Sequence, residues 1–168
     1  GGGTYSWVAS GGGNITTGSG TATPTVDAAG TYTLTVTNTD GCIDSDIVTV
    51  SEDITPPIAG SSVSGIIDCN STTTTVTGTG GGTYSWVATG GGNILTGAGT
   101  ATPTVDAAGT YTVTVTGSNG CTDTDATTVT TDLIPPTADA GADGAIDCTV
   151  SAADLTATGG GTYSWVAS

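Results

Sequence analysis

The residues of this chain that could do chemistry are cysteines and acids, because its 168 residues include no Lys, Arg or His. The usual general bases, Schiff-base amines and imidazole metal ligands are therefore missing. Cations that would neutralise nucleic-acid phosphates or anionic lipid are missing too. No apolar run approaches the roughly 18 residues that a membrane helix needs. We therefore expect no enzyme, no nucleic-acid partner and no membrane insertion.

Two closely spaced pairs of aspartates are the candidate metal ligands. Asp44 and Asp46 flank one Ser, and Asp123 and Asp125 flank one Thr, so each pair shares one face of an expected strand. Carboxylate oxygens of this kind suit Ca²⁺, and the sequence indicates no other cofactor. The alternative is that these acids are solvated surface charge that aids solubility.

Threonine hydroxyls are the third chemical feature, since 40 of the residues are Thr. Alternate threonines on a strand form a hydroxyl row, which on an exported protein could carry O-linked glycans. One alternative is that these threonines lie on a solvent-exposed strand face and reflect only the β-propensity of Thr. Another is that the short Thr rows bind ice. The candidate glycosylation sites are Thr72, Thr73, Thr74, Thr75, Thr112, Thr114 and Thr116.

The elements that position these groups are expected to be strands. Hydrophobic residues make up 35% of the chain and the mean hydropathy is +0.14, which argues against disorder despite 29 Gly. Val, Ile, Tyr and Trp alternate with Thr, the pattern of a half-buried strand. The sequence predicts an all-β sandwich whose strands in the middle of the chain cover residues 62–68, 73–77, 83–88, 94–95, 102–105, 109–116 and 121–131.

An internal repeat organises the chain. Residues 1–10 return at 80–89 with one change and at 159–168 unchanged, and 49 of the 79 positions in 1–79 match 80–158. A period this long indicates a tandem array of domains. The pairs Pro56-Pro57 and Pro135-Pro136 are typical of stiff linkers. We therefore predict the later part of one domain at 1–55, a complete domain at 56–134 and the beginning of the next at 135–168.

Two ways of continuing the array are open. The chain could be part of a longer polymer, or the C-terminal piece of one chain could complete the N-terminal piece of its neighbour by strand complementation. Both predict self-association or a covalent tandem polymer. The ten-residue overlap between 1–10 and 159–168 favours the longer polymer, because complementation would supply that strand twice.

The cysteines recur as one pair per repeat, which in an exported chain indicates disulfides. Pairing Cys69 with Cys121 stays inside the complete domain and closes a loop of about 50 residues, worth about 4 kcal/mol in the loop-entropy model. Cys42 and Cys148 would then have partners elsewhere. The alternative pairs Cys42 with Cys69 and Cys121 with Cys148, across domains or subunits.

Three motifs of the repeat resemble a known family. Residues 106–113 resemble the tyrosine corner that leads into the sixth strand of Ig-like domains, with Tyr111 as the corner residue. Tyr84 and Trp86 resemble the third strand with its core Trp, and residues 136–141 resemble the opening of PKD-type domains. The whole unit is similar to the tandem PKD/Ig-like repeats of secreted Bacteroidota surface adhesins and filaments. The resemblance implies stalks and fibres at the bacterial cell surface.

The sequence thus predicts an extracellular structural filament or adhesin stalk built from tandem Ig-like domains stapled by disulfides. The second hypothesis is a module that binds glycans or a host surface and is displayed on such a stalk. On that hypothesis Trp7, Trp86 and Trp165 could be sugar-stacking platforms, although their alternation with Tyr favours packing in the core.

Overall fold

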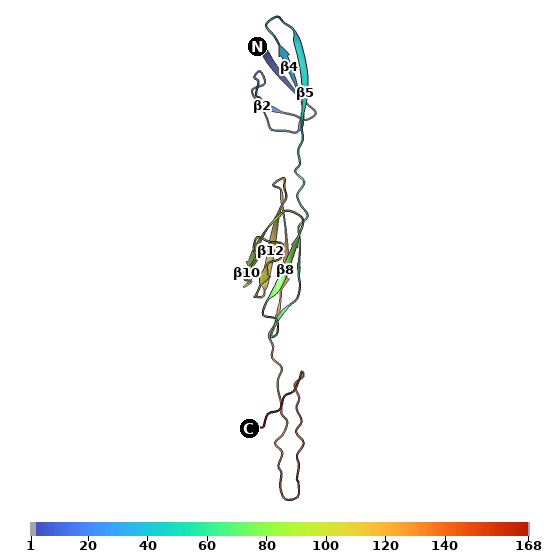
Figure 1. Cartoon of the computed structure of the whole chain (residues 1–168), viewed down its shortest axis with the longest axis vertical. Coiled ribbons are helices and arrows are strands. Elements are labelled where there is room, and N and C mark those ends of the chain that lie inside the picture. Colours follow the sequence, from blue (N-terminus) through green and yellow to red (C-terminus); the bar gives the residue numbers. More distant parts are fainter. Residues whose placement is uncertain (1–2, 168) are drawn as a thin grey trace. The chain divides into compact units, whose positions relative to one another are not determined.

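A computed structural model describes residues 3–167 of the chain (Figure 1). The chain divides into two compact units, residues 1–55 and 56–168. Every regular element of the described residues is a strand, so the all-β prediction is confirmed. Among these residues no helix is long and apolar enough to span a membrane.

The second unit contains a complete β-sandwich. One sheet has the order β10-β11-β8-β6 and the other has the order β13-β12-β9, while a short parallel pair joins β14 to β7. The strands are β6 (Gly60–Val63), β7 (Ile67–Asp68), β8 (Thr74–Thr79), β9 (Thr83–Thr89), β10 (Ile94–Thr96), β11 (Thr104–Val105), β12 (Gly109–Thr116), β13 (Thr122–Val129) and β14 (Thr131–Asp132).

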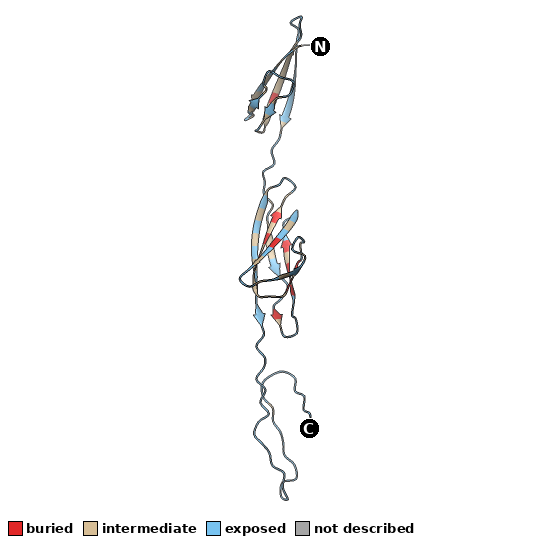
Figure 2. Cartoon of the chain, turned by 90° about the vertical axis from the view of Figure 1, so that its left-hand side faces the viewer, coloured by how far each residue is buried: buried red, intermediate tan, exposed pale blue. Residues whose placement is uncertain are grey.

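The core lies between these two sheets, and the period-2 pattern of β12 shows why. Tyr111, Val113 and Val115 are fully buried, whereas the Thr residues between them are only half buried. Strand β12 is central, with β13 and β9 paired to it in antiparallel register on either side. Its buried face meets the other sheet, and Figure 2 shows the buried residues gathered on the facing strands. The rest of the core cluster is Ile67, Val76, Trp86, Val105 and Val129.

The first and last predicted strands of this domain are each broken in two. The sequence predicts single strands at 62–68 and 121–131, but the structure ends β6 at Val63 and begins β7 at Ile67. The cause is a change of partner, since β6 pairs antiparallel with β8 and β7 pairs parallel with β14. The Ile67 amide donates to the Thr130 carbonyl at 3.1 Å, at the break between β13 and β14.

Glycine is required where the chain enters β12. A Cβ at Gly109 would lie 2.4 Å from the backbone nitrogen of Gly92 and 2.6 Å from the carbonyl oxygen of Thr89. This contact lets the turn after β9 pack on the start of β12. A tight turn at residues 117–120 joins β12 to β13, with Gly120 at a φ of 82°.

The first unit repeats five strands of the sandwich but not the others. Each of its strands begins 79 residues before its counterpart, from β1 against β9 to β5 against β13. The sheet β1-β4-β5 keeps the antiparallel register of β9-β12-β13. The strands are β1 (Thr4–Ser10), β2 (Ile15–Thr17), β3 (Thr25–Val26), β4 (Gly30–Thr37) and β5 (Ile43–Val50).

Residues 133–167 form no named strand. Their one isolated bridge joins Asp139 to Thr158. These residues correspond to Gly60 and Thr79, which pair at one end of the β6–β8 ladder.

Candidate functional site

The acidic pair Asp123 and Asp125 joins the two sheets of the sandwich along one edge. The alternation of β13 turns both carboxylates inward, where β6 passes. Asp123 accepts a hydrogen bond from the Ala59 amide at 2.9 Å, and Asp125 accepts one from the Ser61 hydroxyl at 2.8 Å. We call these four residues the β6–β13 seam.

The seam accounts for the acidic pair without a metal ion. The Ser61 hydroxyl, followed by the Ala126 amide, lowers the pKa of Asp125 from its ordinary value, because both groups stabilise the carboxylate. Among the described residues no group of three or more His, Cys, Asp or Glu could hold a metal ion. The predicted calcium ligation by Asp44, Asp46, Asp123 and Asp125 stays a prediction.

The corresponding pair in the first unit lacks these partners. Asp44 accepts from the amide of the next residue at 2.9 Å, and Asp46 does the same at 2.8 Å. Both side chains are exposed. Together with Leu34 and Val36 they line an open groove of about 450 Å³ on the inner face of the β1-β4-β5 sheet. We call it the inner groove.

Burial values show that the described residues leave this face uncovered. Val113 and Val115 are fully buried in the sandwich, whereas Leu34 and Val36 are only half buried. Within the described residues 3–55, Tyr32 alone is buried. The inner groove is therefore an apolar surface with an acidic rim, built by strands that are covered in the complete domain.

The structure separates the two cysteines that a disulfide inside the complete domain would join. Cys69 follows β7, beside β14, while Cys121 precedes β13. The eight residues of β13 lie between these two ends, roughly 26 Å at 3.3 Å per residue. A disulfide needs Cα atoms within about 7 Å. At this separation Cys69 and Cys121 do not meet inside the folded domain, and all four cysteines are unbonded in the structure. That these cysteines form disulfides with other partners stays a prediction.

The threonine candidates divide by exposure. Thr72 and Thr73 are exposed, and Thr75, Thr112, Thr114 and Thr116 are half buried. Thr74 is 9% exposed and its hydroxyl lies 3.1 Å from the Ser64 hydroxyl. A glycan on Thr74 would displace the core-facing side of β8, so this hydroxyl is not accessible in the folded domain. Glycosylation of the threonine candidates stays a prediction.

The tyrosine corner and the core Trp are where the family resemblance places them. The Tyr111 hydroxyl donates to the Ala107 carbonyl at 2.6 Å and accepts from the Asn93 amide at 3.0 Å. Trp86 is 4% exposed, and its indole nitrogen donates to the Thr100 carbonyl at 3.0 Å. Trp86 is a core residue and has no face free to stack on a sugar.

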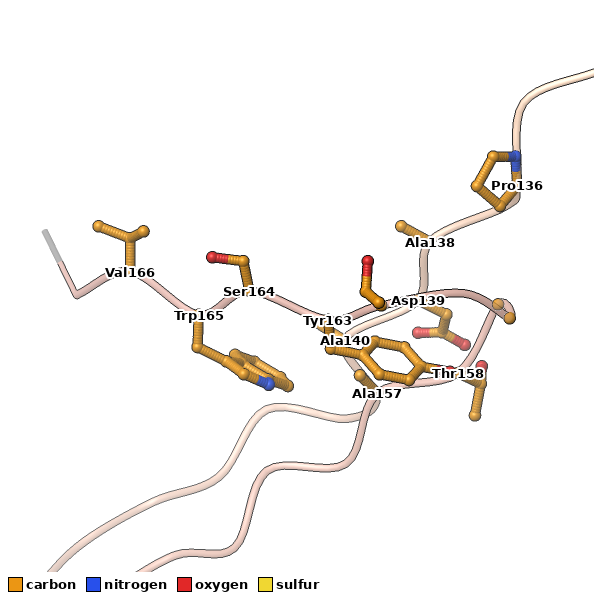
Figure 3. A pocket seen from close by; sticks show the side chains of 13 residues that line it. Pro136, Ala138, Asp139, Ala140, Ala157, Thr158, Tyr163, Ser164, Trp165 and Val166 are labelled. Atoms are coloured by element: carbon orange, nitrogen blue, oxygen red, sulfur yellow. The ribbon is translucent and has the colours of Figure 1, made fainter. Parts of the chain in front are cut away.

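The C-terminal segment has an open pocket of about 450 Å³ that includes Tyr163 and Trp165. These two side chains are 55% and 53% exposed. Figure 3 shows Trp165 on the side of the extended chain opposite to Ser164 and Val166. Residues 138–140 and 157–158 line the same pocket.

Sequence reasoning found the acidic pairs but not their role. No signal within β13 distinguishes a carboxylate that binds a metal from one that accepts an amide hydrogen 64 residues away. The inner groove could have been predicted from the repeat. Residues 1–55 match 80–134, and in the complete domain the strands that cover this sheet come before residue 80.

Residues 56–131 match the family model of the PKD-like domain. The match covers nearly all of the complete sandwich, from the linker before β6 to the first residue of β14. Domains of this kind occur in extracellular or cell-surface proteins and are typically not catalytic. No match to a curated protein was found.

Proposed function

We propose that this protein is a structural component of an extracellular filament or adhesin stalk built from consecutive Ig-like domains. The observation that carries the proposal is the duplicated strand set. Five strands of the first unit and five of the sandwich have the same register and differ by 79 positions. Repetition of one domain along a chain is how a stalk gains length.

The ends of the complete domain support this function. The chain enters beside the β12–β13 turn, where Pro57 lies next to Gly117, and leaves through β14 at the other end of β13. A domain with its two connections at opposite ends extends a chain rather than folding it back. Short linkers that contain two Pro residues act as semi-rigid spacers between such domains.

The test is imaging of the purified native protein by negative-stain electron microscopy. We expect unbranched filaments about one sandwich wide, with a repeat along the axis set by one domain. Globular particles without an axial repeat would contradict the proposal.

A second function, glycan binding, is favoured by the pocket around Tyr163 and Trp165. Exposed aromatic rings beside a polar rim stack well on sugars. The measurement is retention on a glycan array, in which the wild type is compared with Trp165→Ala. Trp86 is buried in the core and offers no ring to the array, so it is unchanged in both proteins. Loss of retention in Trp165→Ala, with the fold intact, would support this function.

A further inference from the structure

The inner groove has a counterpart elsewhere in the chain that fits it. In the complete sandwich, β6, β7 and β8 cover the inner face of the β9-β12-β13 sheet. These strands lie within residues 58–79. Residues 137–158 stand 79 positions later, and in the described structure they are not packed into a sandwich.

We propose that residues 137–158 of one copy of the chain dock in the inner groove of a second copy and complete its sandwich. The proposal rests on the filament function above and names its partner and its contact. We call residues 137–158 the donor segment and the second copy's residues 4–50 the acceptor.

Apolar side chains of the donor segment are exposed where their counterparts are buried. Ile146 and Leu155 are 68% and 59% exposed, whereas the corresponding Ile67 and Val76 are 4% and 0% exposed. The acceptor offers the matching surface through Trp7, Leu34 and Val36, all half buried. Within the described residues, the donor segment and the acceptor therefore expose apolar surfaces that correspond to the two halves of one core.

The polar contact of the seam can also form between copies. In the sandwich the Ala59 backbone amide donates to Asp123. Ala138 stands at the position of Ala59 and Asp44 at that of Asp123, so the same bond needs only a backbone amide and a carboxylate that the chain already has. The second bond of the seam is lost, because Ala140 replaces Ser61.

The donor segment already has the first contact of its hairpin. The bridge between Asp139 and Thr158 corresponds to the pairing of Gly60 with Thr79. Its two hydrogen bonds are 3.1 and 2.9 Å long. Part of the ordering cost of docking is therefore met before the copies meet.

The duplicated strand at residues 159–168 does not prevent docking. In the acceptor its place beside β4 is occupied by β1. The donor's residues 159–168 then stay outside the completed sandwich. They are dispensable for the contact, which gives the experiment a control.

Docking also brings the cysteines of two copies to common junctions. In the complete sandwich, Cys121 lies at the end where the chain enters, near Pro57. Cys42 is the equivalent residue of the acceptor, so in a completed domain it lies at the end where the donor chain enters. The donor's middle domain ends at Cys69 beside β14, just before its linker. Cys69 of the donor and Cys42 of the acceptor thus share one junction, and by the same reasoning Cys148 of the donor and Cys121 of the acceptor share the next.

Each such bridge is formed by thiol–disulfide exchange with a small-molecule disulfide such as oxidised glutathione. Two cysteine thiols lose two protons and two electrons and form one S–S bond. The glutathione disulfide takes up the two protons and two electrons, and its S–S bond breaks to give two glutathione thiols. Two bridges for each docked pair would make the polymer covalent.

The experiment compares the 168-residue chain with two full-length variants. Leu155→Asp places a charge in the donor's apolar face, and Ala152→Asp places one at the position of the exposed Thr73. Light scattering after size exclusion is run over a concentration series, followed by gels without reductant after oxidation by glutathione disulfide. We expect oligomers and a ladder for the wild type and Ala152→Asp, with at least a tenfold weaker association for Leu155→Asp.

Deleting residues 159–168 should leave the association unchanged, and Cys42→Ser should remove only the bridges to Cys69. The proposal is overturned if the wild type stays monomeric, or if Leu155→Asp assembles as well as the wild type. A ladder that survives Leu155→Asp would mean that the thiols react without docking.

Native filaments separate this proposal from the filament function. After reduction and denaturation, a subunit of 15.9 kDa agrees with docking between copies. Filaments whose reduced subunit is several times heavier would keep the stalk function and overturn the docking, because a preceding segment of the same chain would then cover the groove. Absence of filaments would contradict the stalk function itself.

Discussion

The hydroxyl of Tyr111 ties the turn before β12 to the core. It donates to the Ala107 carbonyl and accepts from the Asn93 amide, and the ring is fully buried. Tyr111→Phe keeps the ring and leaves these backbone groups unpaired. We expect the free energy of unfolding to fall by about 1–3 kcal/mol, measured by urea denaturation.

Tyr84→Phe is the matched control for this substitution. Tyr84 packs against the same core but is half buried, and within the described chain no hydrogen bond of its hydroxyl is seen. Its loss should change stability by no more than about 0.5 kcal/mol. Equal effects at both positions would contradict the corner's role.

Asp125 makes the stability of the sandwich depend on pH in the acidic range. Its pKa is lowered in the folded state by the Ser61 hydroxyl and the Ala126 amide. A lowered folded-state pKa contributes stability above the ordinary value of 3.8, and this contribution is lost as pH falls through the lowered value. Ser61→Ala should raise the pKa of Asp125 toward 3.8. Carboxyl carbon shifts followed by NMR between neutral pH and about pH 2 would measure it.

Ser62→Ala is the control for the seam, because Ser62 is the next residue of β6 and is exposed. It should leave the titration of Asp125 where it is. If Ser61→Ala also leaves that titration unchanged, the seam does not have the electrostatic role described here.

At the scale of elements, strands with a strict alternation were predictable from the sequence. Residues 109–116 alternate Tyr and Val with Thr, and β12 has these bounds. The breaks between β6 and β7 and between β13 and β14 were not predictable. They arise because a strand changes its partner, and partner choice depends on residues more than 60 positions away.

The contact at Gly109 is a second feature of element packing. A Cβ there would meet backbone atoms of Gly92 and Thr89, which cannot move aside without breaking the turn. Gly109→Ala should therefore lower the free energy of unfolding by about 1–3 kcal/mol in a thermal or urea melt. In the control Gly65→Ala, the nearest atom to the new Cβ is 4.0 Å away. That variant should be neutral, and destabilisation equal to that of Gly109→Ala would refute the packing argument.

The site shows the same division between local and distant information. The sequence places Asp123 and Asp125 on one face of a strand because they are two residues apart, and the structure shows that this face is the inner one. The sequence does not show that β6 passes beside these carboxylates and supplies their hydrogen-bond donors. Without those donors, calcium was the partner that the sequence suggested. The separation of Cys69 from Cys121 was not predictable for the same reason, since their opposite ends of the domain follow from strand direction and partner.

At the scale of the whole molecule, the charge sets how copies can meet. Each chain carries a net charge of −15 with no Lys, Arg or His, so two copies repel and no salt bridge between side chains can join them. The donor segment and the acceptor both contribute aspartates to this repulsion, among them Asp139 and Asp44. Cohesion must come from apolar burial, backbone hydrogen bonds, disulfides or bound cations.

Salt should therefore strengthen the association of copies. Raising NaCl from about 0.01 M to about 1 M shortens the Debye length from about 30 Å to about 3 Å and screens the repulsion between acidic surfaces. We expect the dissociation constant, measured by sedimentation velocity under reducing conditions, to fall as salt rises. An interface held by ion pairs would respond in the opposite direction, so dissociation in high salt would contradict the apolar docking.

The same measurement distinguishes screening from calcium. Sodium ions act on the whole field, whereas Ca²⁺ would act at Asp44 and Asp46, which are exposed in the first unit and would face the donor segment after docking. If only screening matters, a chelator at constant ionic strength leaves the dissociation constant unchanged, and equal ionic strengths of NaCl and CaCl₂ act alike. If calcium bridges the copies, micromolar to millimolar Ca²⁺ strengthens association at fixed ionic strength, and the variant with Asp44→Asn and Asp46→Asn loses that response. Since the Ala59 amide satisfies the equivalent Asp123 within the sandwich, we expect the first result.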